Sequence, residues 1–290
     1  MTIGVIGYGR FGRLAARYLS REANVFVYDA RRMTVPRGTT RIRKAPLPIV
    51  ASRPIVILAV PVSAMRESLR SMAPFLVPGS LVIDVGAVKT LPARWMKEAV
   101  PGSVSILATH PLFGPDSASR SLRGRIIVLC PVRIGAARLK AVRSALHRKG
   151  LRSVVMKAEE HDRMAAETIL ATQYVGRLVA HAGLSRWPGV TANYRRLLTM
   201  VDIARRDSKD LFVDMARFNP HGREVARAFR RSQEKIGREL GIATRGRSHL
   251  STAGKSPAPS GSASGGSTRR GRGVRSRGAS RRPSSRSTIR

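Results

Sequence analysis

One histidine stands in a setting that suits proton transfer. His110 lies in the segment THPLFGPDS (109–117), which carries two prolines, a glycine and no charge before Asp116. A neutral imidazole can accept a proton near neutral pH, because its ordinary pKa is about 6.5. The prolines restrict the backbone and would hold the ring in place. A general base is one interpretation of His110, and a packing or capping residue is the other.

A glycine pattern near the start of the chain suits the binding of a dinucleotide. The segment GVIGYGRFG (4–12) contains GxGxxG at Gly7, Gly9 and Gly12, between an apolar run and a helical pattern. The first glycine permits a tight turn, the second lets a pyrophosphate approach backbone N–H groups, and the third lets helix and strand pack closely. The helix N-terminus would face the phosphates with its partial positive charge. We therefore expect a dinucleotide-binding turn.

The residues after the second apolar run bear on the choice of cofactor. Asp29 follows the glycine motif by about twenty residues, as a ribose-binding carboxylate does in this motif. That carboxylate would accept hydrogen bonds from the ribose hydroxyls and repel a 2′-phosphate, which favours NAD. Arg31 and Arg32 follow at once and could instead bind the 2′-phosphate of NADP. NAD is the favoured cofactor, and NADP is the alternative.

The first 157 residues alternate short apolar runs with helical patterns, which predicts an α/β fold of the Rossmann type. Continuous apolar strands separated by helices are typical of a doubly wound, mostly parallel sheet covered on both faces. The expected strands are 2–7, 24–29, 54–60, 79–86, 104–110, 124–131 and 152–157, and the expected helices are 11–22, 63–76, 91–100 and 135–150. A basic stretch at 37–48 stands where another helix could have been. His110 would end a strand at the carboxyl edge of the sheet, where open α/β folds bind ligands.

Two further regions follow this dinucleotide-binding domain (1–157). Residues 158–244 lose the strand patterns and keep a 3.6-residue periodicity, interrupted at 185–193, which predicts a second, all-helical domain. Residues 245–290 are dominated by Ser, Gly, Arg and Pro, which predicts a disordered tail.

The net charge of +37 has two interpretations. Twelve of the 54 Lys and Arg residues fall in 245–290, which has no Asp or Glu, so the first 244 residues still carry +25. Scattered arginines of this kind are either a compositional bias on solvated surfaces or a field that attracts anions. The tail could bind polyanions, and because it lacks Phe and Tyr for base stacking, we expect that contact to be weak and salt-sensitive.

Several classes of protein are excluded or disfavoured by the composition. Cys130, as the one cysteine, leaves no internal disulfide and no cysteine cage for a metal, and we expect it to be a small buried side chain. We expect no metal site. No apolar run reaches the roughly 20 residues that span a bilayer. The chain enters its first strand directly, so we expect no targeting peptide and a cytoplasmic location.

The sequence resembles the prephenate/arogenate dehydrogenases, the TyrA family of tyrosine biosynthesis. The matching motifs come in family order over about residues 1–240 and are GVIGYGRFG, VILAVPVSAMRESL, VIDVGAVK, THPLFGPDS and EEHDRMAA. The forms of the histidine and EEHD motifs are similar to those of plant-type arogenate dehydrogenases and of the bacterial T-protein dehydrogenase module.

The resemblance implies an NAD(P)-dependent oxidative decarboxylation of prephenate to 4-hydroxyphenylpyruvate or of arogenate to tyrosine. His110 would accept the proton of the ring hydroxyl. The resemblance also implies a homodimer, and it assigns cofactor contacts to the glycine turn and the residues near it: Gly7, Gly9, Arg10, Phe11, Gly12, Asp29, Arg31, Val60 and Pro61.

For the substrate, the resemblance implies contacts from Thr109, Gln173 and Arg195. A guanidinium binds a carboxylate in a bidentate fork, which suits Arg195 in NYRRLL (193–198), and Arg196 is the alternative. Two positions depart from the family pattern. Ala87 stands where a serine is usual, and Gln173 stands where a second histidine is usual.

Charged residues in two of these motifs have other roles open to them. In EEHD (159–162), the two glutamates complement a helix N-terminus, while His161 and Asp162 could bridge to the sheet, so we expect a domain-anchoring role. Lys89 either supplies a charge near the cofactor or substrate, or is a surface lysine that caps a helix.

Two other functions compete with this interpretation. The chain could be another two-domain NAD(P)-dependent dehydrogenase, acting on a β-hydroxy acid or an imine, although no lysine motif of that kind is present. It could also be a nucleic-acid-associated protein that retains a dinucleotide fold. Prephenate and arogenate both stay open as substrates.

Overall fold

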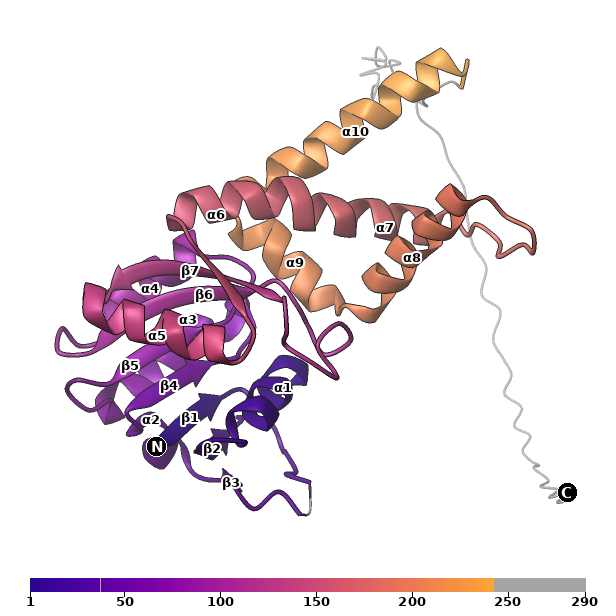
Figure 1. Ribbon diagram of the computed structural model, residues 1–290. Helices are drawn as coiled ribbons and strands as arrows, with labels where there is room; N and C mark the ends of the chain where they lie inside the picture. Colours follow the sequence, from indigo (N-terminus) through magenta and orange to yellow (C-terminus); the bar gives the residue numbers. More distant parts are fainter. Residues whose placement is uncertain (37, 243–290) are drawn as a thin grey trace, which may run out of the picture. The chain divides into compact units, whose positions relative to one another are not determined.

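The protein is built around one mixed, mostly parallel sheet. The computed structural model describes residues 1–36 and 38–242. Within them, eight strands are ordered β3-β2-β1-β4-β5-β6-β7-β8, and β6 and β7 form the antiparallel pair (Figure 1). The strands are β1 (Thr2–Ile6), β2 (Asn24–Tyr28), β3 (Ile42–Lys44), β4 (Ile55–Leu58), β5 (Leu81–Asp84), β6 (Ser105–Pro111), β7 (Ile126–Arg133) and β8 (Arg152–Val155). The predicted doubly wound α/β class is confirmed.

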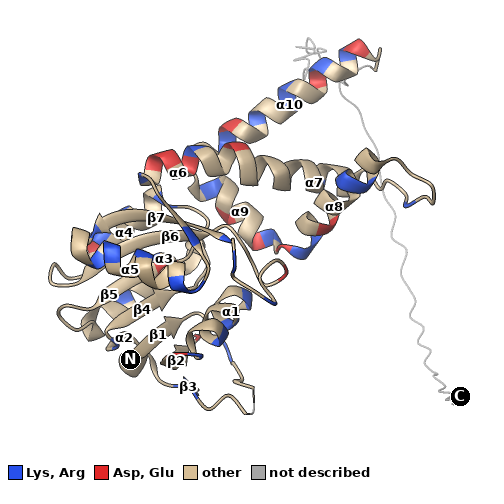
Figure 2. Ribbon diagram, viewed as in Figure 1, with Lys and Arg blue, Asp and Glu red and all other residues tan. Residues whose placement is uncertain are grey.

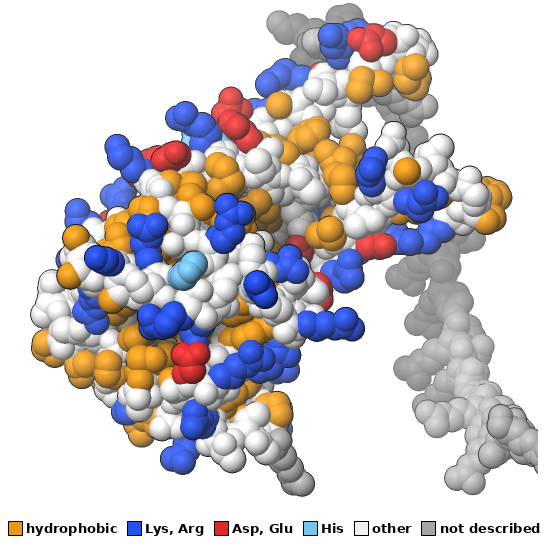
Figure 3. Space-filling model, in the orientation of Figure 1, with side chains coloured by type: hydrophobic (Ala, Val, Ile, Leu, Met, Phe, Trp, Pro, Cys, Tyr) orange, Lys and Arg blue, Asp and Glu red, His pale blue; other side chains and the backbone are white. Residues whose placement is uncertain are grey.

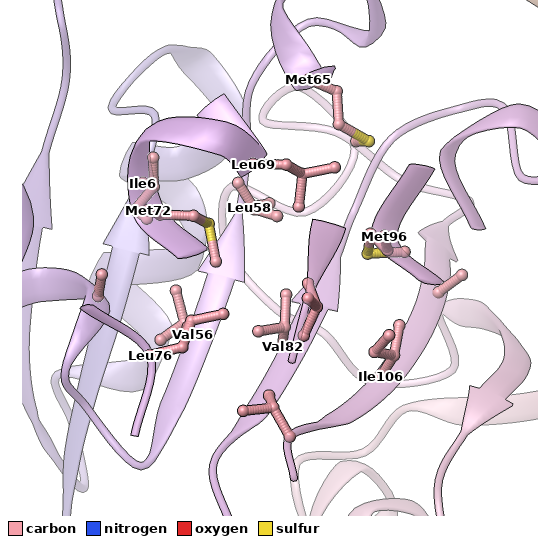
Figure 4. Close-up of a cluster of buried hydrophobic side chains, with 14 of the residues drawn as sticks. Ile6, Val56, Leu58, Met65, Leu69, Met72, Leu76, Val82, Met96 and Ile106 are labelled. Carbon is pink, nitrogen blue, oxygen red and sulfur yellow. The ribbon is translucent and has the colours of Figure 1, made fainter. Parts of the chain in front are cut away.

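The helices of this part of the chain pack on the two faces of the sheet. They are α1 (Arg10–Leu19), α2 (Leu47–Ala51), α3 (Val62–Met72), α4 (Thr90–Ala99) and α5 (Ala136–Arg148). On one face, side chains of the strands meet α3 and α4, as with Leu58, Met65, Leu69 and Met96 in Figure 4. On the other face, Leu14 of α1 joins a second cluster with Leu107 and Leu129. Each fully buried aliphatic side chain stabilises such a core by about 1.5–3 kcal/mol.

The stretch 37–48 differs from the expectation. Instead of an irregular basic connection, it contains the edge strand β3, paired in parallel with β2, and the start of the short helix α2. β3 is only three residues long, and Arg43 and Lys44 are exposed on it. A short strand with charged side chains is a common form of a protected sheet edge, and it carries too few apolar residues to be recognised as a strand.

The last described third of the chain is helical, as predicted. It contains α6 (Ala158–Ala165), α7 (Ala171–His181), α8 (Ala192–Arg206), α9 (Lys209–Phe218) and α10 (Gly222–Glu239), with a π-helical segment (Ala166–Leu170) between α6 and α7. An apolar cluster that includes Val62 and Ala87 from the sheet-forming part and Leu170 and Met215 from these helices joins the two parts. Within residues 1–36 and 38–242, no helix is long and apolar enough to cross a membrane.

The three glycines of the turn between β1 and α1 lie in three different settings. Gly7 has φ +95, a left-handed conformation that L side chains rarely adopt. A Cβ on Gly12 would lie 2.0 Å from the backbone oxygen of Gly7, so α1 can pack this closely on the turn only without one. A Cβ on Gly9 would meet nothing within 4 Å. The space in front of Gly9 is therefore open, although its backbone tolerates other residues.

We predict that Gly12→Ala and Gly9→Ala differ sharply in stability. Gly12→Ala should lower the free energy of unfolding by about 3 kcal/mol, because the new methyl group meets rigid backbone. Gly9→Ala should lower it by less than about 1 kcal/mol, the small cost of alanine at a helix N-cap. Urea denaturation of the two variants checks this. Equal losses would contradict the packing role of Gly12.

Candidate active site

The carboxyl ends of the central strands bring the glycine turn and His110 to one edge of the sheet. Strand register aligns Ile6 with Leu58, Leu58 with Asp84, and Asp84 with Ala108, across four parallel strands. Gly7 directly follows the first of these residues, and His110 lies two residues beyond the last. The histidine therefore lies at the same edge as the glycine turn, where the strand order branches to either side of β1.

Asp29 lies beside the glycine turn, and backbone N–H groups hold its carboxylate. One carboxylate oxygen accepts the N–H of Tyr8 at 2.6 Å, and the other accepts the N–H of Arg31 at 2.8 Å. Val60 also borders the turn, with Cγ1 3.0 Å from the position that a Cβ on Gly7 would take. Pro61 follows as the N-cap residue of α3. The open space at Gly9, the N-terminus of α1 and this carboxylate fit the phosphate and ribose groups of a dinucleotide.

The first residues of α1 contact the loop that follows His110. Arg10 donates to both carboxylate oxygens of Asp116, at 3.0 and 2.9 Å, and to the backbone oxygen of Arg206 at 2.8 Å. The rings of Phe11 and Phe113 are 6.3 Å apart. The structure thus gives Arg10 and Phe11 protein partners that join the glycine turn to the histidine loop and to the end of α8.

His110 lies almost entirely within the protein, with 8% of its surface exposed. Its Nδ1 is 2.9 Å from Nε2 of His161. Burial, then His161 and the cation of Lys89, hold the pKa of His110 well below its ordinary value. The expectation of an ordinary pKa is therefore wrong, because the ring is far less solvated than a loop histidine. His110 is neutral throughout the neutral pH range.

A buried ion pair lies next to His110. Nζ of Lys89 donates to both oxygens of Asp84 at 2.6 Å and to the backbone oxygen of Thr109 at 2.5 Å, and both charged side chains are fully buried. Burial raises the pKa of Asp84, and the ammonium group opposes that rise. Of the two roles open to Lys89, that of a surface lysine is wrong, because the side chain is fully buried. Lys89 is still the N-cap residue of α4, but its side chain turns inward.

The predicted bridge between the EEHD segment and the sheet is confirmed. The backbone N–H groups of Lys89 and Thr90 donate to the two carboxylate oxygens of Asp162, at 2.8 and 2.9 Å. The side-chain amide of Asn219 donates to the backbone oxygen of Asp162 at 2.7 Å. The contact of His161 with His110 was not predicted. The placement of a histidine and a carboxylate next to each other in EEHD was the only signal for it in the sequence.

Two of the three predicted substrate residues, Thr109 and Gln173, are buried. The hydroxyl of Thr109 is buried and donates to the backbone oxygen of Asp84 at 2.6 Å. Gln173 is buried on α7, its amide nitrogen donates to the carboxylate of Asp207, and its Oε1 has no hydrogen-bond partner among the described residues. Ala87, the position without the family's serine hydroxyl, packs in the apolar cluster that joins the two parts.

Arg195 is not brought to this edge by the fold of a single chain. It is exposed in the first turn of α8, where Nη1 donates to the backbone oxygen of Val190 at 2.7 Å. Arg206, whose backbone oxygen meets Arg10, is at the other end of the same helix, about 16 Å away at the usual rise per residue. The neighbouring Arg196 is exposed as well and bonds to Asn193.

The basic surplus is spread over the described surface. Lys and Arg side chains occur on the sheet-forming part and on the helices (Figure 2), and on the face drawn in Figure 3 they are scattered among apolar and neutral groups. The arrangement resembles a general positive field more than a binding patch on one element.

Comparisons with known proteins agree with this geometry. A family model described as "Prephenate dehydrogenase, nucleotide-binding domain" matches residues 15–155. Arogenate dehydrogenase 2, chloroplastic, from Arabidopsis thaliana is 29% identical over 250 residues, which are 83% of this chain and 70% of that protein. Arogenate dehydrogenase 1 from the same plant is 28% identical over 251 residues, 83% of this chain but only 39% of that longer protein.

A solved structure shows the same fold. Prephenate dehydrogenase from Aquifex aeolicus, in complex with hydroxyphenyl propionate and NAD+, superimposes with a TM-score of 0.63 at 19% identity, over 83% of this chain and 92% of that one. The family model covers most of the sheet and the Arabidopsis relatives extend the match into the helices, so this chain is similar to the prephenate/arogenate dehydrogenases over most of its described residues.

Proposed function

We propose that this chain is an NAD(P)-dependent oxidoreductase that catalyses the oxidative decarboxylation of prephenate to 4-hydroxyphenylpyruvate, or of arogenate to tyrosine, in tyrosine biosynthesis. The observation that carries the proposal is a neutral, nearly buried His110 at the same strand edge as the glycine turn. The Arabidopsis relatives, named arogenate dehydrogenases, support it.

In this proposal, residues 1–157 hold the dinucleotide. Gly7, Gly9 and Gly12 shape the turn for the pyrophosphate, and Asp29 takes the ribose hydroxyls, which favours NAD over NADP. Arg10, Phe11, Arg31, Val60 and Pro61 border that turn or follow Asp29. When bound, the oxidised nicotinamide supplies the hydride acceptor.

His110 takes the proton of the ring hydroxyl as the carbon that bears it loses hydride. The carboxylate then leaves as carbon dioxide and the ring becomes aromatic, which supplies the driving force. The protein therefore needs to orient the substrate and provide one base. A ring that is neutral throughout the neutral pH range meets this need without prior deprotonation.

Residues 158–244 complete the substrate contacts in the proposal. Oε1 of Gln173, which has no hydrogen-bond partner among the described residues, can accept a hydrogen bond from the substrate. The exposed guanidinium of Arg195 would bind the substrate carboxylate from a second copy of the chain, because a single chain does not bring it to the edge where His110 lies. Thr109 contributes by fixing the backbone before His110, through its hydroxyl and its carbonyl.

A homodimer and a cytoplasmic location belong to the same proposal. Large apolar side chains are exposed on and between the last helices, namely Leu184, Trp187, Ile203, Ile236 and Leu240, and exposed apolar groups of this kind support a contact with a second copy. The predicted polyanion-binding tail, 245–290, lies outside the described residues and stays a prediction.

The purified protein should turn over at least one of four substrate–cofactor pairs: prephenate or arogenate, each with NAD or NADP. Reduced nicotinamide is followed by its absorbance, and a β-hydroxy acid serves as the comparison substrate. We expect the NAD pairs to be faster. Turnover of the β-hydroxy acid alone would contradict the proposal and favour a different two-domain dehydrogenase.

Replacing His110 tests the proposed base. His110→Asn should lower kcat by about 10²–10⁴-fold, the usual contribution of a general base, and leave the Kd for the cofactor unchanged. The control is His147→Asn, an exposed histidine on α5. If His110→Asn stays within about tenfold of the wild type, another group accepts the proton.

The low pKa of His110 predicts the shape of the pH profile. Because the folded protein disfavours protonation of this ring, kcat/KM should show no loss as pH falls to about 6.5 and should decline only below that value. The unfolded chain binds the proton more readily, so the free energy of unfolding should also fall as pH drops below about 6.5. Its fall should be smaller in His110→Asn. A midpoint of kcat/KM above 6.5 would contradict the burial argument.

A further inference from the structure

His110 is the first of three buried side chains that form a continuous line of hydrogen bonds. Its Nδ1 lies 2.9 Å from Nε2 of His161, and Nδ1 of His161 lies 2.9 Å from a carboxylate oxygen of Asp162. The two rings meet edge to face, with centroids 5.1 Å apart and planes at 69°. His161 and Asp162 have no exposed surface. The ionic state of the last member therefore influences the first.

The carboxylate of Asp162 can only accept hydrogen bonds. The backbone N–H groups of Lys89 and Thr90 already donate to its two oxygens, and donors of this kind stabilise the ionised form. Burial raises the pKa of Asp162, but the hydrogen bonds from His161, Thr90 and Lys89 outweigh it and bring that pKa below its ordinary value. The nitrogen of His161 that faces this oxygen, Nδ1, must therefore carry a proton.

That proton decides the state of the next two nitrogen atoms. A neutral imidazole has one N–H and one lone pair, so His161 with a proton on Nδ1 accepts through Nε2. The facing Nδ1 of His110 must then be the donor, at a separation of 2.9 Å. A neutral His110 with Nδ1–H carries its lone pair on Nε2, the nitrogen that makes no hydrogen bond to residues 1–36 or 38–242.

The other titratable groups around the histidines are already satisfied or inert. The three donors of Lys89 are used by Asp84 and by the backbone oxygen of Thr109. Burial raises the pKa of Cys130, on the neighbouring strand β7, to about 12, so its thiol stays protonated. Glu159, an exposed residue one turn before Asp162, contributes through its negative charge to the raised pKa of Cys130. None of these groups offers His110 Nδ1 a competing partner in the described structure.

We propose that His161, anchored by Asp162, is a positioning residue that holds His110 in the Nδ1–H tautomer and leaves Nε2 free to take the substrate's hydroxyl proton. The inference rests on the proposed function. When His110 Nε2 takes the proton, the ring becomes an imidazolium whose Nδ1–H points through His161 towards the carboxylate. The same line of bonds thus keeps the ring of His110 in place while the proton is transferred, as a buried carboxylate orients a histidine base in other enzymes.

The tautomer can be measured without any substrate. Protein labelled with nitrogen-15 histidine at about pH 7.5 distinguishes protonated ring nitrogens from those with a lone pair. His110→Asn and His147→Asn identify the His110 signals among the six histidines. In the wild type we expect N–H at Nδ1 and a lone pair at Nε2, for both His110 and His161. A wild-type His110 that is protonated at Nε2 would overturn the inference, whatever the turnover.

Two substitutions at position 161 separate positioning from a merely structural role. His161→Leu removes the acceptor, so His110 should become a mixture of tautomers and kcat should fall by about 10–100-fold, the effect of losing a partner that orients a working histidine. His161→Gln keeps a carbonyl oxygen that can accept from Nδ1, so it should restore the Nδ1–H pattern and most of kcat. KM and the Kd for the cofactor should change little in either variant.

The outcomes also separate this inference from the proposed function. Equal kcat in the Leu and Gln variants, with both melting like the wild type, would overturn the positioning role and leave the function standing. If His161→Leu does not fold, the wild-type tautomer and the Gln variant still decide. A wild type that turns over none of the four substrate–cofactor pairs would overturn the function, and with it the catalytic purpose of His161.

Discussion

The hydrogen bonds from the backbone of Lys89 and Thr90 to Asp162 are the interaction on which the rest of the site depends. They fix the middle of α6 against the start of α4, and Asn219, which follows α9, adds a bond to the same residue. Because His161 precedes Asp162 in the chain, the bonds also fix where its ring lies. A carboxylate with no exposed surface would be costly without such donors. The same hydrogen bonds therefore hold the helical part on the sheet and align His110 through His161.

The buried pair of Asp84 and Lys89 lies at the same edge of the sheet, next to Thr109 and His110. Removing two charges from water costs about as much as their attraction returns, so such a pair is weak evidence of added stability. Its position is more informative. Lys89 holds the carbonyl of Thr109 and places a positive charge near His110, which adds to the effects of burial and of His161 in lowering the pKa of that ring.

The local parts of this arrangement could be predicted from the sequence, and the long-range parts could not. The glycine turn depends on backbone conformation and close packing within twelve residues, and the strand that ends near His110 is a continuous apolar run, so residue types carry both signals. The inward side chain of Lys89 contradicts the usual exposure of lysine, and one of its partners, the backbone oxygen of Thr109, is on strand β6. The contact between His110 and His161 joins positions 51 apart and depends on how α6 docks. The distance of Arg195 from the glycine turn likewise follows from the direction of α8, which no local pattern gives.

The reversal of direction between β6 and β7 has a consequence for how this enzyme can vary. Parallel strands return through helices, which take the chain away from the carboxyl edge of the sheet. The antiparallel pair instead closes through a hairpin over residues 112–125, so the connection stays beside His110. Insertions and deletions are best tolerated in such connections. Changes in its length would reshape access to the histidine while every strand keeps its register, which gives relatives a route to new substrate preferences without rebuilding the sheet.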